Sequence, residues 1–240
     1  MGHLIGVTGT GTGVGKTVLT ALLTVHLRGL GRQAIAIKPF CAGSWDDPRL
    51  LQAANDRERN LEEITPVYCS QGLAPLAALG EKEASQAISI ATQSIEKERA
   101  VTEVLLIEGI GGVAVPITTT NTIGDVLHSV GAHHIVVGVN RLGVINEVVL
   151  TAGYLKSLGG QSPVIVLMEE ASPDSSAASN LKVIRQVLGH DRLCTIPFLS
   201  GWGHESVASR AYQKELGKTL AQILSWVNVR PVDGQSGVLL

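Results

Sequence analysis

The sequence of 240 residues has few aromatic and sulfur-containing side chains. Phe, Trp and Tyr together make up 3% of it, and it has three cysteines and two methionines. The cysteines, Cys41, Cys69 and Cys194, are odd in number and far apart, and no C-x-x-C pair occurs. We therefore expect neither a disulfide framework nor a cysteine-based metal or redox centre. This usage suits a reducing compartment, and the cytoplasm is the expected location.

Excess charge of one sign and long apolar runs are also missing. The formal net charge is −2, which predicts no surface for nucleic acid. Although 45% of the residues are hydrophobic, no apolar run approaches the roughly 18 residues that a membrane span needs. The opening M-G-H-L-I-G-V has no cationic stretch ahead of an apolar one, so no signal peptide is expected. We expect small molecules as partners, rather than nucleic acid or a membrane.

What the sequence does contain is an alternation of short aliphatic runs with helical patterns. We expect strands at residues 3–8, 33–38, 103–108, 134–139, 163–168 and 193–197, and helices at residues 16–28, 84–99, 122–130, 145–158, 175–188 and 205–226. Strands that are apolar on both faces predict an α/β fold, in which a mainly parallel sheet has helices on both faces. The length suits a single domain over residues 1–226, followed by a loosely ordered tail over 227–240.

The most informative stretch, residues 8–17, reads T-G-T-G-T-G-V-G-K-T. The strict phosphate-loop pattern G-x-x-x-x-G-K-[ST] needs a glycine where Thr10 stands, and the glycine lies one residue earlier, at Gly9. The stretch nevertheless joins an expected strand to an expected helix, whose free N–H groups and dipole would favour an anion. Lys16 would reach the outer phosphates, and the Thr17 hydroxyl would face Mg²⁺. The alternative is a tight turn with a surface lysine.

Charged residues close two further expected strands. In a parallel sheet, ligands gather beyond the carboxyl ends of the strands. Lys38 ends one strand, and Pro39 keeps it extended; alternatively, it reaches solvent. Asp46 and Asp47 could reach a metal or cap a helix. Glu108 ends four aliphatic residues and precedes three glycines, so its carboxylate needs a partner, for which Mg²⁺ and a hydrogen-bonded turn are the alternatives.

Four motifs stand in order: G-T-G-T-G-V-G-K-T, K-P-F-C-A-G, I-E-G-I-G-G and L-G-V-I-N. Together they resemble the dethiobiotin synthetases, from about residue 3 to about residue 200. The loop of that family, G-T-x-T-x-V-G-K-T, has the same extra residue. The resemblance implies a homodimer with a P-loop NTPase type of fold, with ATP as co-substrate and Mg²⁺ as cofactor. It also implies closure of a cyclic urea on 7,8-diaminononanoate with CO₂, through a carbamate and a carbamic–phosphoric anhydride.

The resemblance assigns roles by position. The catalytic residues would be Thr12, Lys16 and Lys38, and the metal ligands Thr17, Asp47 and Glu108. The nucleotide would contact Gly11, Thr12, Gly13, Val14, Gly15, Lys16, Thr17, Glu108, Gly111, Gly112, Glu169 and Pro197. Diaminononanoate would contact Lys38, Ala42, Gly109, Gly111, Leu142, Gly143, Ile145 and Asn146. Residues 142–146 match the segment that reaches the substrate of the partner subunit.

The sequence departs from the family pattern at three places. Gly11 replaces the loop aspartate of many members, and Ala42 replaces a hydroxyl residue. After the fifth expected strand, Met168 and Glu169 stand where many members place the asparagine that reads adenine. The phosphate-binding residues remain, whereas the usual base-reading residue is lost. We therefore expect loose selectivity among nucleoside triphosphates.

Two other interpretations stay open. One is another protein of the P-loop group, either an amidotransferase-linked synthetase of cobalamin synthesis or a chromosome-partitioning ATPase. The former usually carry a glutaminase domain, for which 240 residues leave no room. The latter usually carry an additional lysine early in the loop, where this chain has Thr and Gly. The other interpretation is a non-catalytic nucleotide-binding regulator, against which the retention of Lys16, Thr17, Lys38 and Glu108 argues.

Overall fold

The computed structural model of the chain describes residues 2–203, 207 and 212–229, and a six-stranded sheet forms its centre. Across the sheet the strands are, in order, β2 (Ala34–Ile37), β5 (Val104–Glu108), β1 (His3–Gly9), β6 (His133–Val139), β7 (Val164–Met168) and β8 (Leu193–Ile196). Every neighbouring pair is parallel. All six strands expected from the sequence are confirmed, and so is the mainly parallel sheet.

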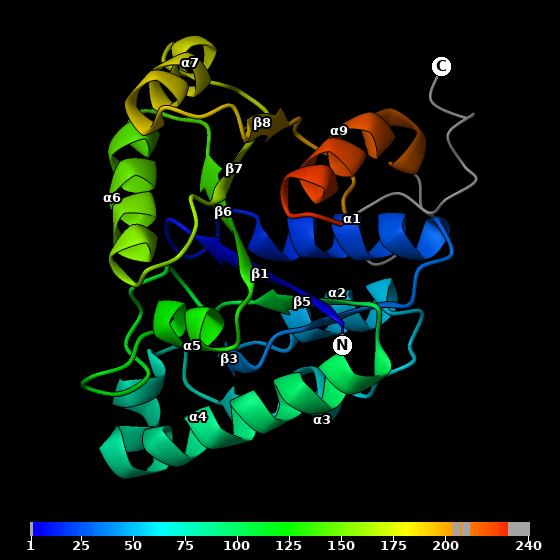
Figure 1. Cartoon of the computed structure of the whole chain (residues 1–240), viewed down its shortest axis with the longest axis vertical. Helices are drawn as coiled ribbons and strands as arrows, with labels where there is room; N and C mark the ends of the chain where they lie inside the picture. Colours follow the sequence, from blue (N-terminus) through cyan, green and yellow to red (C-terminus); the bar gives the residue numbers. More distant parts are fainter. Residues whose placement is uncertain (1, 204–206, 208–211, 230–240) are drawn as a thin grey trace.

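Helices cover both faces of this sheet, as predicted (Figure 1). One face packs against α1 (Lys16–Gly29), α2 (Asp46–Ala54) and α9 (Gln213–Trp226). The other packs against α4 (Pro75–Val101), α5 (Ile123–Ser129), α6 (Val144–Ser157) and α7 (Ala177–Leu188). Strand residues alternate between the two layers: Ile5 and Val7 join the α1 core, and Leu4 joins the α4–α5 core. This double burial explains why most strand residues are aliphatic.

The segment between β2 and α4 contains structure that the sequence pattern did not predict. β3 (Phe40–Ala42) pairs in parallel with β4 (Val67–Cys69) in a small second sheet. α3 (Leu61–Ile64) spans four residues and begins with a capping box between Asn60 and Glu63. α2 was also missed. Strands of three residues and a single helical turn are too short to show a period.

Two helices begin at places other than those expected. α4 starts at Pro75 rather than 84, and Gly80 has a φ of 75° inside it, so only its later part has the regular helical pattern. The helix expected at 205–226 is described as α9 from Gln213, and residues 204–206 and 208–211 lie outside the described residues.

The division into a domain over 1–226 and a tail over 227–240 stays a prediction. Val227 and Val229 are buried in the α1 core, and residues 230–240 lie outside the described residues. Within the described ranges, no helix combines the length and the apolar character needed to cross a bilayer.

Candidate active site

The glycine-rich loop joins β1, near the middle of the sheet, to the start of α1. Gly13 and Gly15 have φ angles of 75° and 95°, in the region that favours glycine. Gly15 is the N-cap of α1 and makes no side-chain cap, so the first N–H groups of the helix are available to an anion. A Cβ on Gly15 would lie 2.8 Å from the Cγ of Met168. The predicted strand–loop–helix unit is confirmed.

The displaced glycine has a structural reason. Gly9 is the last residue of β1, and a Cβ there would lie 2.7 Å from Val14 Cγ2 and 3.2 Å from Lys16 Cδ. The loop folds back over the end of the strand, so this position has no room for a side chain. Thr10, where the strict pattern needs glycine, donates its hydroxyl to Glu147 Oε2 on α6 at 2.9 Å.

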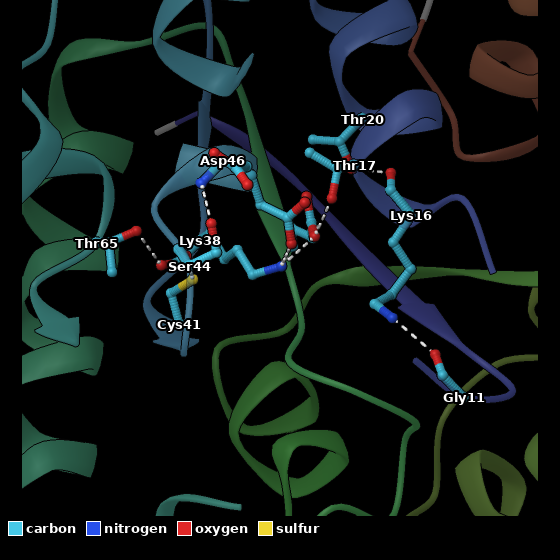
Figure 2. Close-up of polar contacts among 11 residues, drawn as sticks. Gly11, Lys16, Thr17, Thr20, Lys38, Cys41, Ser44, Asp46 and Thr65 are labelled. Carbon is cyan, nitrogen blue, oxygen red and sulfur yellow. Dashed lines mark hydrogen bonds and ion pairs between the residues drawn. The ribbon is translucent and has the colours of Figure 1, made fainter. Parts of the chain in front are cut away.

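Lys16 opens α1 and is almost fully buried, with 6% of its surface exposed. Its Nζ donates to the carbonyl oxygen of Gly11 at 2.8 Å (Figure 2). Burial lowers the pKa of Lys16 to about 8; the charge of Glu108 opposes this shift, and that of Lys38 adds to it. An anion bound in the loop would stabilise the ammonium form, because opposite charges at close range favour ionisation.

Lys38 and Glu108 meet because of the strand register. Ile37 pairs with Ile107, so the next residue of each strand lies at the same edge of the sheet. Lys38 Nζ donates to Glu108 Oε1 at 2.6 Å and to Asp47 Oδ2 at 2.5 Å. Figure 2 shows this ammonium among the carboxylate oxygens. Lys38 is 5% exposed, so the alternative in which it reaches solvent is wrong.

Within the ion cluster of Lys38, Asp47 and Glu108, the shifted pKa values of Lys38 and Asp47 both favour the charged form. Burial would lower the pKa of Lys38, but the charges of Glu108 and Asp47 outweigh it and raise the pKa. Burial would likewise raise the pKa of Asp47, but the ammonium of Lys38 outweighs it and lowers the pKa. Asp46, the alternative to Asp47, is exposed and makes no contact with Lys38 among the recorded ion pairs of the described chain.

The predicted metal ligands come together. Thr17 Oγ1 donates to Glu108 Oε1 at 2.7 Å, and Asp47 approaches the same group through Lys38. Glu108 is fully buried, and its Oε2 has no hydrogen-bond partner among the described residues. A buried carboxylate oxygen without a partner is costly. Two carboxylates and a hydroxyl are all oxygen donors, as Mg²⁺ prefers, and the donor set leaves positions for water and phosphate.

These residues line one cavity of about 610 Å³. Of the predicted site residues, it contains Thr12, Gly13, Gly15, Lys16, Thr17, Lys38, Ala42, Asp47, Glu108 and Gly111. The sequence did not single out the apolar part of the wall, to which Leu50, Leu73 and Val115 contribute, nor Trp202. No motif includes Trp202. The sequence shows only that Trp202 is one of three tryptophans in the chain, which does not place it in a site.

Four other predicted residues do not line the cavity, although they belong to the two loops that border it. Val14 packs in the core, and the carbonyl of Gly11 accepts from Lys16. The Gly109 N–H donates to the carbonyl of Val7 at 2.9 Å. A Cβ on Gly112 would lie 3.2 Å from the carbonyl oxygen of Thr10. These positions shape the backbone around the cavity.

The remaining predicted residues lie away from this cavity. Leu142 is 80% exposed, Asn146 is exposed, and Gly143, with a φ of 99°, is the N-cap of α6; Ile145 follows in its first turn. Exposure is what a segment that reaches another subunit requires, and that role stays a prediction.

The two predicted base-side contacts also lie outside the cavity wall. Pro197 is exposed just after β8. Glu169 is half-buried, and its Oε1 accepts a hydrogen bond from Asn140 Nδ2 at 2.8 Å. The Oδ1 of Asn140 accepts in turn from Asn180 at 3.0 Å. The sequence did not predict this network, which fixes the orientation of the Glu169 carboxylate.

Comparisons with known proteins agree with this geometry. A family model described as an AAA domain matches residues 3–206. An ATP-dependent dethiobiotin synthetase of Anaeromyxobacter sp. (strain Fw109-5) is 31% identical over 195 residues, covering 79% of this chain and 87% of the relative. A protein of the same name from Aquifex aeolicus (strain VF5) is 33% identical over 186 residues, covering 76% and 84%.

Solved structures with a similar fold include the MinD cell division protein of Aquifex aeolicus, with a TM-score of 0.58 and 14% identity over 96% of this chain and 98% of that one. A ParA family ATPase from Chlorobium tepidum TLS has a TM-score of 0.57 and 13% identity over 95% and 98%. At such identity the likeness bears on the fold alone. It supports the predicted P-loop NTPase type of α/β fold.

Proposed function

The chain belongs to the family of ATP-dependent dethiobiotin synthetases, and we propose that it closes the cyclic urea of dethiobiotin on 7,8-diaminononanoate, using CO₂ and ATP. The observation that carries the proposal is the ion cluster beside the phosphate loop, in which the buried Lys38 and Glu108 meet the half-exposed Asp47. Lys16 and Lys38 line the same cavity, which supports a role for Lys16 with a phosphate and for Lys38 with a second anion.

The chemistry needs both lysines. A neutral substrate amine attacks CO₂ and loses a proton, which gives a carbamate. A carbamate oxygen then attacks the γ-phosphorus of ATP, ADP leaves, and a carbamic–phosphoric anhydride remains. Two anions must approach each other in this step, so cations have to lie between them. Lys16 lies in the phosphate loop and Lys38 beyond it, and these are the two cationic side chains on the described cavity wall.

Ring closure follows within the same site. The second amine attacks the carbonyl carbon of the anhydride and loses a proton, the C–O bond to the phosphate breaks, and phosphate leaves with the bonding pair and takes up that proton. We assign Lys16 and Thr12 to the phosphoryl oxygens and Lys38 to the carbamate. Both steps place developing negative charge on oxygens that fixed donors can stabilise, which is the main source of rate enhancement in such reactions.

The metal assignment follows from the donor set. We propose that Thr17, Asp47 and Glu108 hold Mg²⁺, which when bound supplies positive charge to the outer phosphates. The unpartnered Oε2 of Glu108 supports this role. Lys38 already offsets part of the charge of both carboxylates. The metal is therefore expected to bind tightly only together with the nucleotide, whose phosphates supply further negative charge.

We also propose a homodimer in which residues 142–146 bind the carboxylate of the partner's diaminononanoate. Two observations support this proposal. Leu142 and Leu150 are large apolar side chains that are 80% and 65% exposed on or beside α6, and the N-terminus of this 14-residue helix is capped only by Gly143. A symmetric interface would give two such sites per dimer. The cytoplasm remains the proposed location, on the composition of the sequence alone.

Changing Asn146 to Asp tests the shared site. A second carboxylate would face that of the substrate, so the KM for diaminononanoate is expected to rise at least about tenfold because of like-charge repulsion. The KM for ATP should change little. Steady-state kinetics measures both constants, and sedimentation velocity measures the oligomeric state. An unchanged substrate KM, or an active monomer, would contradict the shared site.

The reaction itself is tested by mixing the protein with diaminononanoate, bicarbonate, Mg²⁺ and ATP and detecting dethiobiotin by mass. Omission of each component in turn is the control, and an authentic family enzyme is run in parallel. Absence of product while that enzyme works would overturn the proposed function. Nucleotide binding without turnover would instead favour a non-catalytic nucleotide-binding regulator.

A further inference from the structure

The segment that follows β8 contributes one side chain to the active-site cavity. Trp202 lines the cavity together with Gly15, Thr17 and Val18, the residues at the start of α1. It is the only aromatic side chain on the cavity wall among the residues that the structure describes. None of the motifs that identify the family includes it.

The protein itself holds this ring in place. The backbone N–H of Trp202 donates to the carbonyl of Leu199 at 3.4 Å, and Leu199 is buried against the α1 core. The indole packs against the ring of Tyr212, with centroids 5.7 Å apart and planes tilted by 39°. The Tyr212 hydroxyl donates to the carbonyl of Ser200 at 2.5 Å, which ties the same segment together. The ring is therefore positioned before any ligand binds.

The indole N–H of Trp202 lacks a hydrogen-bond acceptor. Its Nε1 is shielded from solvent and has no partner within the described part of the chain. A buried tryptophan usually pairs this N–H, because leaving it unpaired costs free energy. Because Nε1 has almost no accessible surface, protein atoms cover it, and the ring meets the cavity through its other atoms.

The other base-side candidates do not fill this role. Glu169 does not line the cavity, and Asn140 engages one of its oxygens. The polar residues on the wall, from Thr12 to Glu108, face the phosphate and carbamate chemistry. An aromatic ring on the wall of this cavity is a suitable surface for a nucleobase, because every base has a π-face that can stack.

We propose that Trp202 forms the base-binding wall of the nucleotide site, where the base stacks against the indole. This assignment rests on the proposed use of a nucleoside triphosphate. Stacking is tolerant of base identity but is stronger for the larger purines. Trp202 thus gives the site a modest preference for purines.

The test measures nucleotide binding without the reaction, so it is independent of turnover. Isothermal titration with MgATP and MgCTP, in the absence of diaminononanoate and bicarbonate, is applied to Trp202→Leu and Trp202→Phe. We expect Trp202→Leu to weaken ATP binding about tenfold and CTP binding about threefold, in line with typical losses of base stacking. Trp202→Phe keeps an aromatic face and should lose about threefold for ATP.

Trp226→Phe is the matched control, because Trp226 lies at the end of α9 and lines a different cavity, at the start of β7. It should bind both nucleotides as the unchanged protein does. Circular dichroism and the Tm of each variant establish that the fold is kept. If Trp202→Leu is folded and binds ATP and CTP with unchanged affinity, the proposal is wrong, even where dethiobiotin formation proceeds. A loss that is equal for ATP and CTP would contradict the purine preference that we assign to Trp202.

Discussion

The two ends of the active-site cavity differ in how their polar groups are held. At the end formed by β2, β5 and the loop, Lys38 contacts two carboxylates within 2.6 Å, and Thr17 contacts one of them. At the end formed by the segment after β8, the wall presents Trp202, whose N–H has no acceptor in the described chain. At the first end Lys38 and the two carboxylates are oppositely charged partners, whereas at the second end the wall is formed by an apolar ring.

The difference follows from what each end has to do. Phosphoryl transfer to a carbamate requires fixed positive charge at defined places, and loss of one buried charge leaves its partners uncompensated. The base contributes to binding of the nucleotide, and none of its bonds is made or broken in the reaction. Its contacts can vary with little effect on the reaction. Substitutions at the first end should therefore have much larger effects than changes at the second.

Lys16→Ala should give the largest loss. In the proposed mechanism Lys16 contacts the transferring phosphoryl group, so its removal withdraws charge stabilisation from that group. By analogy with other such donors, kcat should fall about 10³-fold, or roughly 4 kcal/mol. The Tm should be kept, since burial already makes the charged form of Lys16 costly. The check is single-turnover formation of dethiobiotin. A near-normal kcat would mean that the loop is not catalytic.

Lys38→Gln should impair turnover more than nucleotide binding. In the proposed mechanism this ammonium faces the carbamate, so kcat should fall about 10²-fold, while the Kd for ATP changes less than about threefold. Lys97→Gln removes an exposed lysine charge from α4 and is the matched control. Titration of ATP binding and product assays are run on both variants. Equal losses of turnover and of ATP affinity would place Lys38 on the nucleotide instead.

The sequence predicts the charged end of the cavity better than the base end, for a physical reason. Lys38 and Glu108 each close an aliphatic strand, and adjacent parallel strands end at the same edge, so their meeting follows from local pattern and sheet register. Asn140 and Asn180 are 40 residues apart and meet through the packing of α7. Trp202 likewise reaches the cavity through the path of a loop. Neither contact leaves a periodic signal.

The length of each strand also determined whether it could be predicted from the sequence. All six strands of the main sheet show as aliphatic runs, because both faces are buried. β3 and β4 have three residues each, and their pairing depends on the chain returning from α3. That small sheet positions Cys41 and Ala42 on the cavity wall. The placement of Cys41 and Ala42 on the cavity wall therefore could not be predicted from the periodicity of the sequence.

Raising the pH should weaken nucleotide binding at the charged end. The pKa of Lys16, lowered by burial to about 8, is expected to rise when phosphate binds. Below pH 8 the free protein already carries the proton; above it, binding must take up a proton, so affinity falls. Between pH 7 and pH 9 the Kd for ATP should rise about tenfold. The pKa of Lys38 is raised, so it stays charged throughout.

Lys16→Arg is the control for this pH effect, because a guanidinium stays charged across the range. Its Kd for ATP, whatever its value at pH 7, should be nearly constant up to pH 9. Calorimetric titration at each pH, in buffers of different ionisation enthalpy, also measures the proton uptake directly. A flat profile for the unchanged protein would show that Lys16 is not the titrating group.

Nucleotide selectivity should give the smallest effect and tests the base end directly. Rejection of a wrong base requires buried donors and acceptors that it leaves unpaired. Here the position of the usual base-reading asparagine holds Glu169, a carboxylate that can only accept, with one oxygen already bonded to Asn140. Met168, beside Gly15, offers a soft apolar surface that tolerates any ring. The triphosphate contacts are independent of the base.

Values of kcat/KM for GTP, CTP and UTP should thus lie within about tenfold of that for ATP, or roughly 1.4 kcal/mol. Backbone groups beyond Pro173 or near Pro197 are the alternative readers of adenine. A preference for ATP above about a thousandfold, roughly 4 kcal/mol, would require such a contact and would remove the contrast between the two ends.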